Sequence, residues 1–228
     1  MTGSANTVTM GNVIDGWDGS TNLNSNGFSL TKAGAGTLSL VGTGYFSGNL
    51  NLTAGTLALT SNLALQNATL NFTAGTLTLT GLTNSTFGGL AGNQNIALPG
   101  TGFALTLNPG LYDNDVYSGN LSGTSATVTI NGTGLQAFSG NNTYTGGTTL
   151  DSGTLGINNG GTATGSAIGT GTLTILGGNL DNTSGSNQTL ATNNAEAWNS
   201  NFTFRGSGNL NMGTGAGTMN ASRTVTVI

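Results

Sequence analysis

Short stretches in which apolar and polar residues alternate recur along the chain, and most of them share one motif. The motif Gly-Thr-Leu-x-Leu/Ile begins at Gly36, Gly55, Gly75, Gly153 and Gly171. Consecutive close copies recur at roughly every 18–20 residues, counted from glycine to glycine. Alternation with a period of two is typical of a β-strand that buries one face. A single strand cannot bury that face, whereas a stack of strands, one from each repeat, buries all of them together.

The repeat therefore predicts an all-β fold, a β-solenoid with one coil for roughly every 18–20 residues. The 228 residues would then make roughly eleven coils and, at about 4.8 Å per coil, a rod on the order of 50 to 55 Å long. Two weaker copies, Phe103–Leu107 and Ala126–Ile130, lie between Gly75 and Gly153. Glycine and asparagine between the strands permit sharp corners. A β-sandwich is the alternative, and it is disfavoured because a sandwich needs no fixed repeat.

The apolar positions of the repeats are expected to point inward and to stack from coil to coil as the structural core. Residues 138–157 show the same alternation, interrupted by expected corners at Asn141-Asn142 and Gly146-Gly147. The expected core residues are Leu38, Leu40, Leu57, Leu59, Leu77, Leu79, Phe138, Tyr144, Leu150, Leu155, Ile157, Leu173 and Ile175.

Composition excludes several classes of function. Charged residues make up 4% of the chain, against about 25% in a typical globular domain. Cysteine and histidine are absent, which excludes disulfides, thiolate metal sites and the commonest general base. The three basic residues, Lys32, Arg205 and Arg223, are too few for a nucleic-acid-binding surface. The chain has no apolar run of the length that a membrane-spanning helix needs, so no such segment is expected.

Carboxylates are the remaining candidates for metal binding or catalysis. Asp113 and Asp115 alternate around an asparagine in a pattern that calcium uses, but the other ligands of a calcium loop are missing, so this is a weak calcium candidate. β-Helix enzymes that cleave acidic polysaccharides need clustered Asp, Lys or Arg. Asp151 and Asp181 lie about one and a half coils apart and need not share a face. We therefore expect no catalytic residues, no enzyme activity and no cofactor.

The two tryptophans have structural interpretations. Trp17, between Asp15 and Asp18, is expected to cover the N-terminal end of the solenoid, with the carboxylates facing water. Trp198 is expected to pack in the core or at a corner. Its surroundings, residues 195–202, are the one stretch in which a helical turn is expected.

The chain is interpreted as a single β-solenoid over residues 1–228. Residues 1–28 are expected to form an N-terminal cap or first coil, without the basic and apolar regions of a signal peptide. Residues 84–121 hold both prolines and predict irregular coils or a loop insertion, where a binding surface could form. Residues 193–228 predict C-terminal coils with an open end. The candidates for assembly at that end are Val225, Val227 and Ile228.

The segment SGNNTYTGGTTLDSGTLGI, residues 139–157, closely resembles the autotransporter-associated β-strand repeat of large bacterial surface proteins. The pattern continues in GSAIGTGTLTILGGNLDNTSG, residues 165–185, and in residues 193–228. The resemblance implies a right-handed parallel β-helix of the autotransporter passenger type. It also implies export to the cell surface or the extracellular space.

These observations predict a non-catalytic structural or adhesive segment of an exported bacterial surface or matrix protein, acting as a stiff rod. Its partners are expected to be copies of itself, neighbouring repeats of a longer chain or surface glycans. A subunit that stacks end to end into a filament is one alternative, and a glycan-binding or polysaccharide-degrading module is another. Ice binding by an array of outward threonines is a third. The pairs that could form this array on one face begin at Thr76, Thr127, Thr172 and Thr224.

Overall fold

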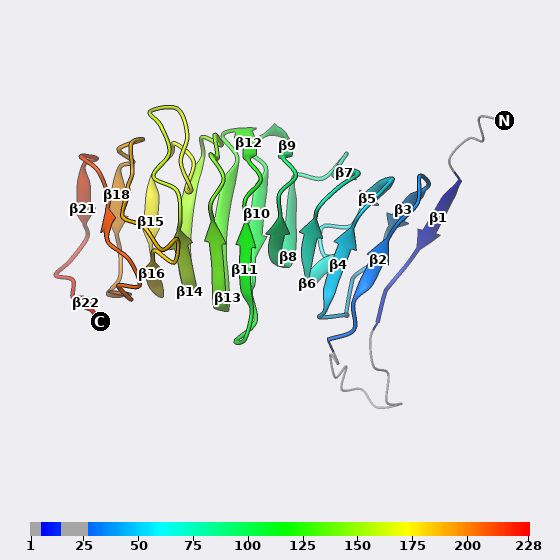
Figure 1. Cartoon of the computed structure of the whole chain (residues 1–228), viewed down its shortest axis with the longest axis horizontal. Helices are drawn as coiled ribbons and strands as arrows, with labels where there is room; N and C mark the ends of the chain where they lie inside the picture. Colours follow the sequence, from blue (N-terminus) through cyan, green and yellow to red (C-terminus); the bar gives the residue numbers. More distant parts are fainter. Residues whose placement is uncertain (1–5, 15–26) are drawn as a thin grey trace.

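The chain forms a parallel β-solenoid, in a computed structural model that describes residues 6–14 and 27–228. Over these residues every ladder between strands is parallel, and there is no helix. The strands stack side by side into a rod, from β1 at one end to β21 and β22 at the other (Figure 1). The predicted β-solenoid is confirmed, and an antiparallel β-sandwich is excluded.

The length of a turn changes along the rod. Leu30 pairs with Leu50, and Leu50 pairs with Leu70, so these two turns take about 20 residues each. Thr148 pairs with Leu173, so this later turn takes about 25 residues. The chain makes about nine turns, fewer than the eleven expected, because the later turns are longer. With about 4.8 Å per turn, the rod is roughly 43 Å long.

Each turn has three faces, because the strands fall into three successive positions around it. The chain enters face 1 at the corner that ends face 3 of the turn before. The strands of face 1, some of which continue around the next corner, are β6 (Leu65–Phe72), β8 (Asn84–Gly92), β10 (Ala104–Leu107), β13 (Thr127–Phe138), β14 (Gly147–Ile157), β15 (Leu173–Ile175), β18 (Glu196–Trp198) and β21 (Gly217–Met219).

Face 2 receives the second halves of the four long strands β6, β8, β13 and β14, which cross the corner without a break. Its remaining strands are β2 (Leu30–Lys32), β4 (Asn49–Leu52), β11 (Asn114–Tyr117), β16 (Asn179–Asp181), β19 (Phe202–Phe204) and β22 (Val225–Val227). Because faces 1 and 2 share long strands, their ladders merge into one sheet of 14 strands.

Face 3 is assembled from shorter, separate ladders. Its strands are β1 (Thr7–Met10), β3 (Thr37–Leu40), β5 (Thr56–Leu59), β7 (Thr76–Thr78), β9 (Ile96–Thr101), β12 (Leu121–Thr124), β17 (Gln188–Thr189) and β20 (Leu210–Asn211). β1, β3, β5 and β7 form one sheet, β9 pairs only with β12, and β17 pairs with β20. The ladder on this face is thus interrupted between β7 and β9.

The core runs along the axis of the rod as columns of stacked side chains. On face 2, Leu50 pairs with Leu70 and Leu70 with Leu90, and all three are fully buried. Of the core residues expected from the sequence, Leu77 is half-buried and packs against the core, and the others are buried in it. Burying one such side chain contributes about 1.5–3 kcal/mol, so the columns supply most of the driving force for folding.

The motif Gly-Thr-Leu-x-Leu/Ile does not form a single column. Its first three copies lie on face 3, in β3, β5 and β7. The copy that begins at Gly153 lies on face 2, where Leu155 pairs with Leu180. The copy that begins at Gly171 lies on face 1, where Leu173 pairs with Thr148. The interval between the last two copies therefore runs from face 2 through face 3 to face 1 and is shorter than one turn.

Corners are shaped by asparagine and glycine. Asn95 Oδ1 accepts the N–H of Asn120 at 2.9 Å, and Asn120 Oδ1 accepts the N–H of Asn141 at 2.7 Å, which makes an asparagine ladder over three turns. Gly140 lies against the turn below, where a Cβ atom would overlap the carbonyl of Gly119. Corners of this kind allow adjacent turns to approach to β-sheet spacing.

Candidate functional site

One corner loop on the side of the rod carries adjacent exposed apolar side chains. The loop, residues 108–113, joins β10 on face 1 to β11 on face 2. Tyr112 at its tip is 93% exposed, Leu111 is 66% exposed, and Val116 on the following strand is 44% exposed. Within residues 84–121, expected to be irregular, β10 pairs regularly with β8, and β11 with β13, whereas β11 and β8 share only one pair.

The base of this loop is fixed by hydrogen bonds. Asp113 Oδ2 accepts the N–H of Gly110 at 2.6 Å, and the Asp113 N–H donates to the carbonyl of Gly110 at 2.9 Å. On the next turn, the N–H groups of Thr133 and Gly134 donate to the carbonyl of Pro109 at 2.8 and 3.0 Å. The backbone of the loop is therefore held in one conformation while its tip faces solvent.

The calcium candidates Asp113 and Asp115 have different environments. Asp113 closes the turn at Gly110, whereas Asp115 accepts a hydrogen bond from the Thr69 hydroxyl at 3.1 Å. No group of three or more His, Cys, Asp or Glu side chains converges within residues 6–14 and 27–228. Calcium binding at this pair stays a prediction.

Asp115 occupies a partly buried position against glycine. Its carboxylate lies where a side chain on Gly89 would be, and this space exists because residue 89 has no Cβ. Burial raises the pKa of Asp115 to about 6, opposed by the hydrogen bond from Thr69, and the nearby Asp113 carboxylate raises it further. The Asp115 side chain, which lies in the wall of the rod, is therefore partly protonated near pH 6.

Gln136 is a buried polar residue that the sequence pattern did not single out. It pairs with Asp115 on one side and Leu155 on the other, so it lies in an inward column between a carboxylate and the leucine of the next turn. Its amide bonds both the N–H and the carbonyl of Leu90, at 2.9 and 2.8 Å. A glutamine flanked by Leu135 and Ala137 gives no sequence signal, because only the turn-to-turn register places it inside.

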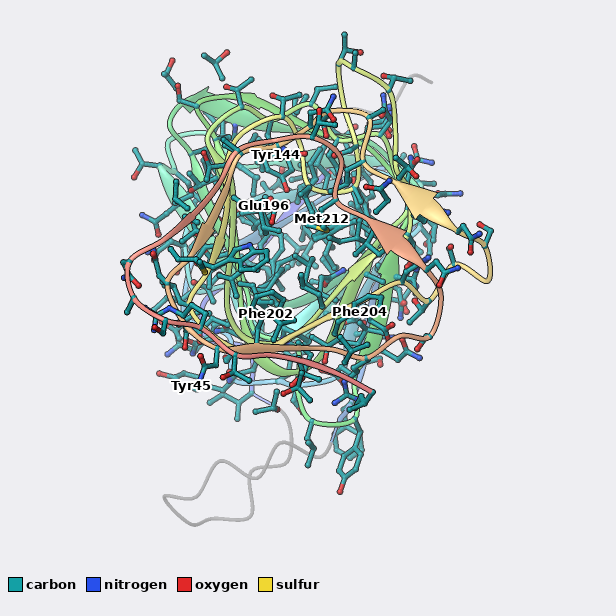
Figure 2. All side chains as sticks on the ribbon, turned by 90° about the vertical axis from the view of Figure 1, so that its left-hand side faces the viewer. Tyr45, Tyr144, Glu196, Phe202, Phe204 and Met212 are labelled. Atoms are coloured by element: carbon teal, nitrogen blue, oxygen red, sulfur yellow. The ribbon has the colours of Figure 1, made fainter. Side chains whose placement is uncertain are left out.

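The C-terminal end of the rod is apolar and open. A cavity of about 220 Å³ is lined there by side chains of the last two turns, among them Trp198, Phe204, Met212 and Val227. Figure 2 looks onto this end and shows Phe202, Phe204, Met212 and Glu196 gathered within the ring of the last turns. The predicted assembly residues Val225, Val227 and Ile228 are exposed, at 39%, 70% and 73%.

Glu196 and Trp198 form the polar part of this end. Trp198 Nε1 donates to the Glu196 carboxylate at 2.8 Å, and the indole meets Phe202 edge-on with ring centroids 5.3 Å apart. Burial raises the pKa of Glu196, opposed by the bond from Trp198. The helical turn expected around Trp198 is wrong: the residue ends strand β18, whose partners β15 and β21 hold it in the sheet.

The opposite end presents a second surface groove of about 330 Å³, lined by β1, β2 and β3. Lys32 lies there in a buried position. Its ammonium group donates to the carbonyls of Ala33, Gly34 and Ala54 at 2.7 to 3.0 Å. This lysine therefore satisfies corner carbonyls. Trp17, Asp15 and Asp18, expected near this end, lie outside the described residues.

The carboxylates considered for catalysis are not brought together. Asp181 is buried, and its two oxygens accept hydrogen bonds from Ser207 and from the Asn182 N–H. Asp151 is exposed at the end of the face 1 segment of β14. Asp181 thus has a structural role, because it fixes the corner after β16.

The predicted array of threonine pairs does not form on one face. Thr76 lies on face 3, Thr127 and Thr172 on face 1, and Thr224 beside face 2. The structure contains a different row, in which five successive turns of face 1 place a threonine at the same outward position. These residues are Thr86, Thr106, Thr129, Thr149 and Thr174. Thr129 and Thr174 are the second residues of two predicted pairs, and the other three members were missed because the row draws on turns of unequal length.

Comparison with known proteins agrees with this architecture. A family model described as the passenger-associated-transport-repeat matches residues 30–59 and 128–157. The adhesin BmaC autotransporter of Brucella suis biovar 1 (strain 1330) is 35% identical over 214 residues, which are 90% of this chain. The chain spans only 6% of that relative's length. No solved structure matches the chain. None of the described residues belongs to a helix that could cross a membrane.

Proposed function

Because a family model described as the passenger-associated-transport-repeat matches residues 30–59 and 128–157, we propose that this chain is a non-catalytic, adhesive rod segment of an exported bacterial surface protein. The relative is named an adhesin autotransporter and is 35% identical to this chain over 214 residues, and the family model matches two segments of the chain. On this proposal the chain works outside the cell, where it extends and displays side-chain surfaces. It does so without carrying out a reaction.

The observation that carries the proposal is the continuity of the parallel ladder and its apolar columns along the rod. The merged sheet of faces 1 and 2 runs from β2 to β21 and β22. Core side chains from Leu38 to Phe202 form one hydrophobic cluster within the described residues. A rod held by interturn hydrogen bonds and a continuous core resists bending and leaves few flexible segments for proteases.

Display of the chain on a non-adherent bacterium tests the proposal. We expect the displayed chain to resist added protease and to increase attachment of the bacteria to a surface coated with host cells. Leu150→Asp, which puts a charge into the buried column of face 1, should abolish both effects. If the displayed chain resists protease but the bacteria attach no better than bacteria without it, the adhesive part of the proposal is contradicted. Rapid digestion of the parent chain would contradict the rod.

We also propose that the apolar C-terminal end is a contact for further turns, either of a longer chain or of a second copy. The cavity lined by Trp198 and Phe204 and the exposed edge β22 leave apolar side chains and backbone groups to be covered. Light scattering and electron microscopy of the purified chain distinguish the two occupants. Filaments that grow with concentration identify a second copy, which is the end-to-end assembly. A monodisperse monomer at all concentrations overturns the end-to-end assembly.

The threonine row on face 1 makes ice binding a second candidate function. Thr106, Thr129 and Thr149 repeat at the spacing of successive strands, about 4.8 Å, on a face that is flat in this direction. The neighbouring outward row includes Ala104 and Gly147, so the regular array is one residue wide. Thermal hysteresis of the parent chain, lost in Thr129→Lys, would establish this function. A parent chain without thermal hysteresis excludes it.

A further inference from the structure

Exposed apolar side chains on the flank of the rod are concentrated in one place. Most of the large apolar residues that reach solvent lie near the two ends, in β1 and its neighbours or in β21 and β22. Val41 also belongs to the N-terminal end, because its N–H bonds the carbonyl of Met10 in β1. Away from the ends, Leu176 stands on a corner of its own, whereas Leu111, Tyr112 and Val116 occur together on the corner loop and the strand that follows it.

The loop presents the Tyr112 ring on a fixed support. Asp113 and Gly110 close the turn, and Pro109 is tied to Thr133 and Gly134 on the next turn. Gly132 and Gly134 leave space for the loop, because a Cβ atom on either would overlap the backbone of Pro109 or Gly110. A tyrosine has only two side-chain torsions, so a ring on such a support loses little entropy when it binds a partner.

Exposed polar residues lie close to Tyr112 in the chain and on the turn that supports its loop. Asn114, Asn131 and Thr133 are all exposed, on the strand after the loop and on the turn that supports it. Asn131 Oδ1 accepts a hydrogen bond from Ser152, which orients its amide. The surface thus combines one apolar platform with amide and hydroxyl groups that can donate and accept hydrogen bonds.

The carboxylates near this loop disfavour anionic partners. The charged residues of this loop and of β11 are Asp113 and Asp115, both carboxylates. Lys32 is on the far N-terminal turns, and Arg205 and Arg223 belong to the last turns. Phosphate groups, anionic lipid headgroups and uronic acids would meet negative charge here without a compensating cation. Insertion into a membrane surface also needs a larger apolar face bordered by basic residues.

We propose that the corner loop of residues 108–113 is a contact site for neutral carbohydrate, with Tyr112 as the stacking platform. The apolar face of an uncharged sugar ring would lie on Tyr112 and Leu111. Its hydroxyl groups would bond Asn114, Thr133 and the free carboxylate oxygen of Asp113. The inference rests on the proposed function, because it supplies the adhesive rod with a ligand class and a position.

Titration of the labelled chain by nuclear magnetic resonance tests the site. The probes are neutral hexasaccharides of glucose, mannose and N-acetylglucosamine, with hexagalacturonate as the anionic comparison. We expect at least one neutral probe to shift the amide signals of the loop and of Thr133, with little dependence on salt concentration. Tyr112→Ala should weaken that binding by about tenfold or more, whereas Tyr112→Phe keeps the platform and should change it by about threefold or less.

Leu176→Ser is the control, because it removes an exposed apolar side chain from a different corner, and it should bind as the parent does. The proposal is overturned if no neutral probe shifts the loop, if Tyr112→Ala binds as tightly as the parent, or if hexagalacturonate binds as well as the neutral probes. Protease resistance of the same samples reports on the rod separately. A resistant chain that fails to bind overturns the site alone, whereas a digested parent chain overturns the rod.

Discussion

Gln136 bonds both backbone groups of Leu90, a residue 46 positions earlier and two turns away. Its Nε2 donates to the Leu90 carbonyl at 2.8 Å, and its Oε1 accepts the Leu90 N–H at 2.9 Å. Strand β11 lies between them and pairs with β8, the strand of Leu90, only at Tyr117 and Gly92. The glutamine amide therefore supplies the hydrogen bonds that the open part of this ladder lacks.

Replacing this amide is expected to destabilise the fold. Gln136→Leu would continue the column toward Leu155 but would leave the N–H and carbonyl of Leu90 buried without partners, at a cost of about 2 kcal/mol. Urea unfolding measures the loss. Leu155→Met, a volume-conserving change at the next position of the same column, is the control and should cost less than about 1.5 kcal/mol. Equal stability of Gln136→Leu and the parent would show that the ladder closes without the amide.

The strands and the solenoid could be predicted from sequence, because alternation and repetition are local signals. The assignment of repeats to faces could not. The two family matches, residues 30–59 and 128–157, both end in a Gly-Thr-Leu-x-Leu/Ile copy. The first ends in β5 on face 3 and the second in β14 on face 2. The same sequence unit builds any face, because each face needs only two inward apolar side chains after a tight corner.

The candidate site was predictable only in outline. Two prolines in residues 84–121 indicated a loop insertion, and the structure places an exposed loop there at residues 108–113. Asp115 and Gln136 were not predictable as interior residues. Their burial depends on register with Gly89 and Leu90, and one residue more or less in an intervening turn would turn both side chains outward.

The raised pKa of Asp115 predicts that the chain is more stable in acid than at neutral pH. The carboxyl ordinarily titrates at 3.8, and in the folded chain its pKa is about 6. Between these values the folded state binds more protons than the unfolded state, so stability falls as pH rises. The side chain is partly accessible, which limits the loss to about 2 kcal/mol.

Thermal unfolding of the parent and of Asp115→Asn across pH 4 to 7 measures this effect. The variant keeps the size of the side chain without its charge and should show a flatter pH dependence. Asp151→Asn, at an exposed carboxylate, is the control and should leave the slope of the parent unchanged. A parent chain whose stability rises over this range would contradict the assignment. Burial also raises the pKa of Glu196, so Asp115→Asn should retain part of the slope.

Glycines at the corners are expected to differ in their tolerance of a side chain. Gly140→Ala would place a methyl group against the Gly119 carbonyl, which belongs to backbone that cannot move aside. We expect a loss of about 3 kcal/mol. Gly217→Ala points into open space and should change stability by less than about 1 kcal/mol. The urea concentrations at the unfolding midpoints of the two variants measure this difference in stability. Similar midpoints would mean that the turns can separate at little cost.

Asn142 is expected to be a local support of the interturn contact on face 3. The side chain is fully buried; its Oδ1 accepts the N–H of Leu121 at 2.7 Å and its Nδ2 donates to the carbonyl of Ala167 at 2.6 Å. It thus joins the turn below to the turn above. Asn142→Ala would leave both backbone groups without partners in a dry environment, which costs about 2–3 kcal/mol.

Hydrogen exchange locates this loss, because turns of a solenoid contact only their neighbours and open locally. The Leu121 amide should exchange on the order of 30-fold faster in Asn142→Ala, since about 2 kcal/mol of protection is removed. Amides of β4 and β6, several turns away, should keep the parent rates. Asn131→Ala, at an exposed asparagine on a different corner, should leave Leu121 unchanged. Faster exchange throughout the chain would instead show that the rod unfolds as one cooperative unit, and unchanged protection of Leu121 would show that Asn142 does not hold these turns together.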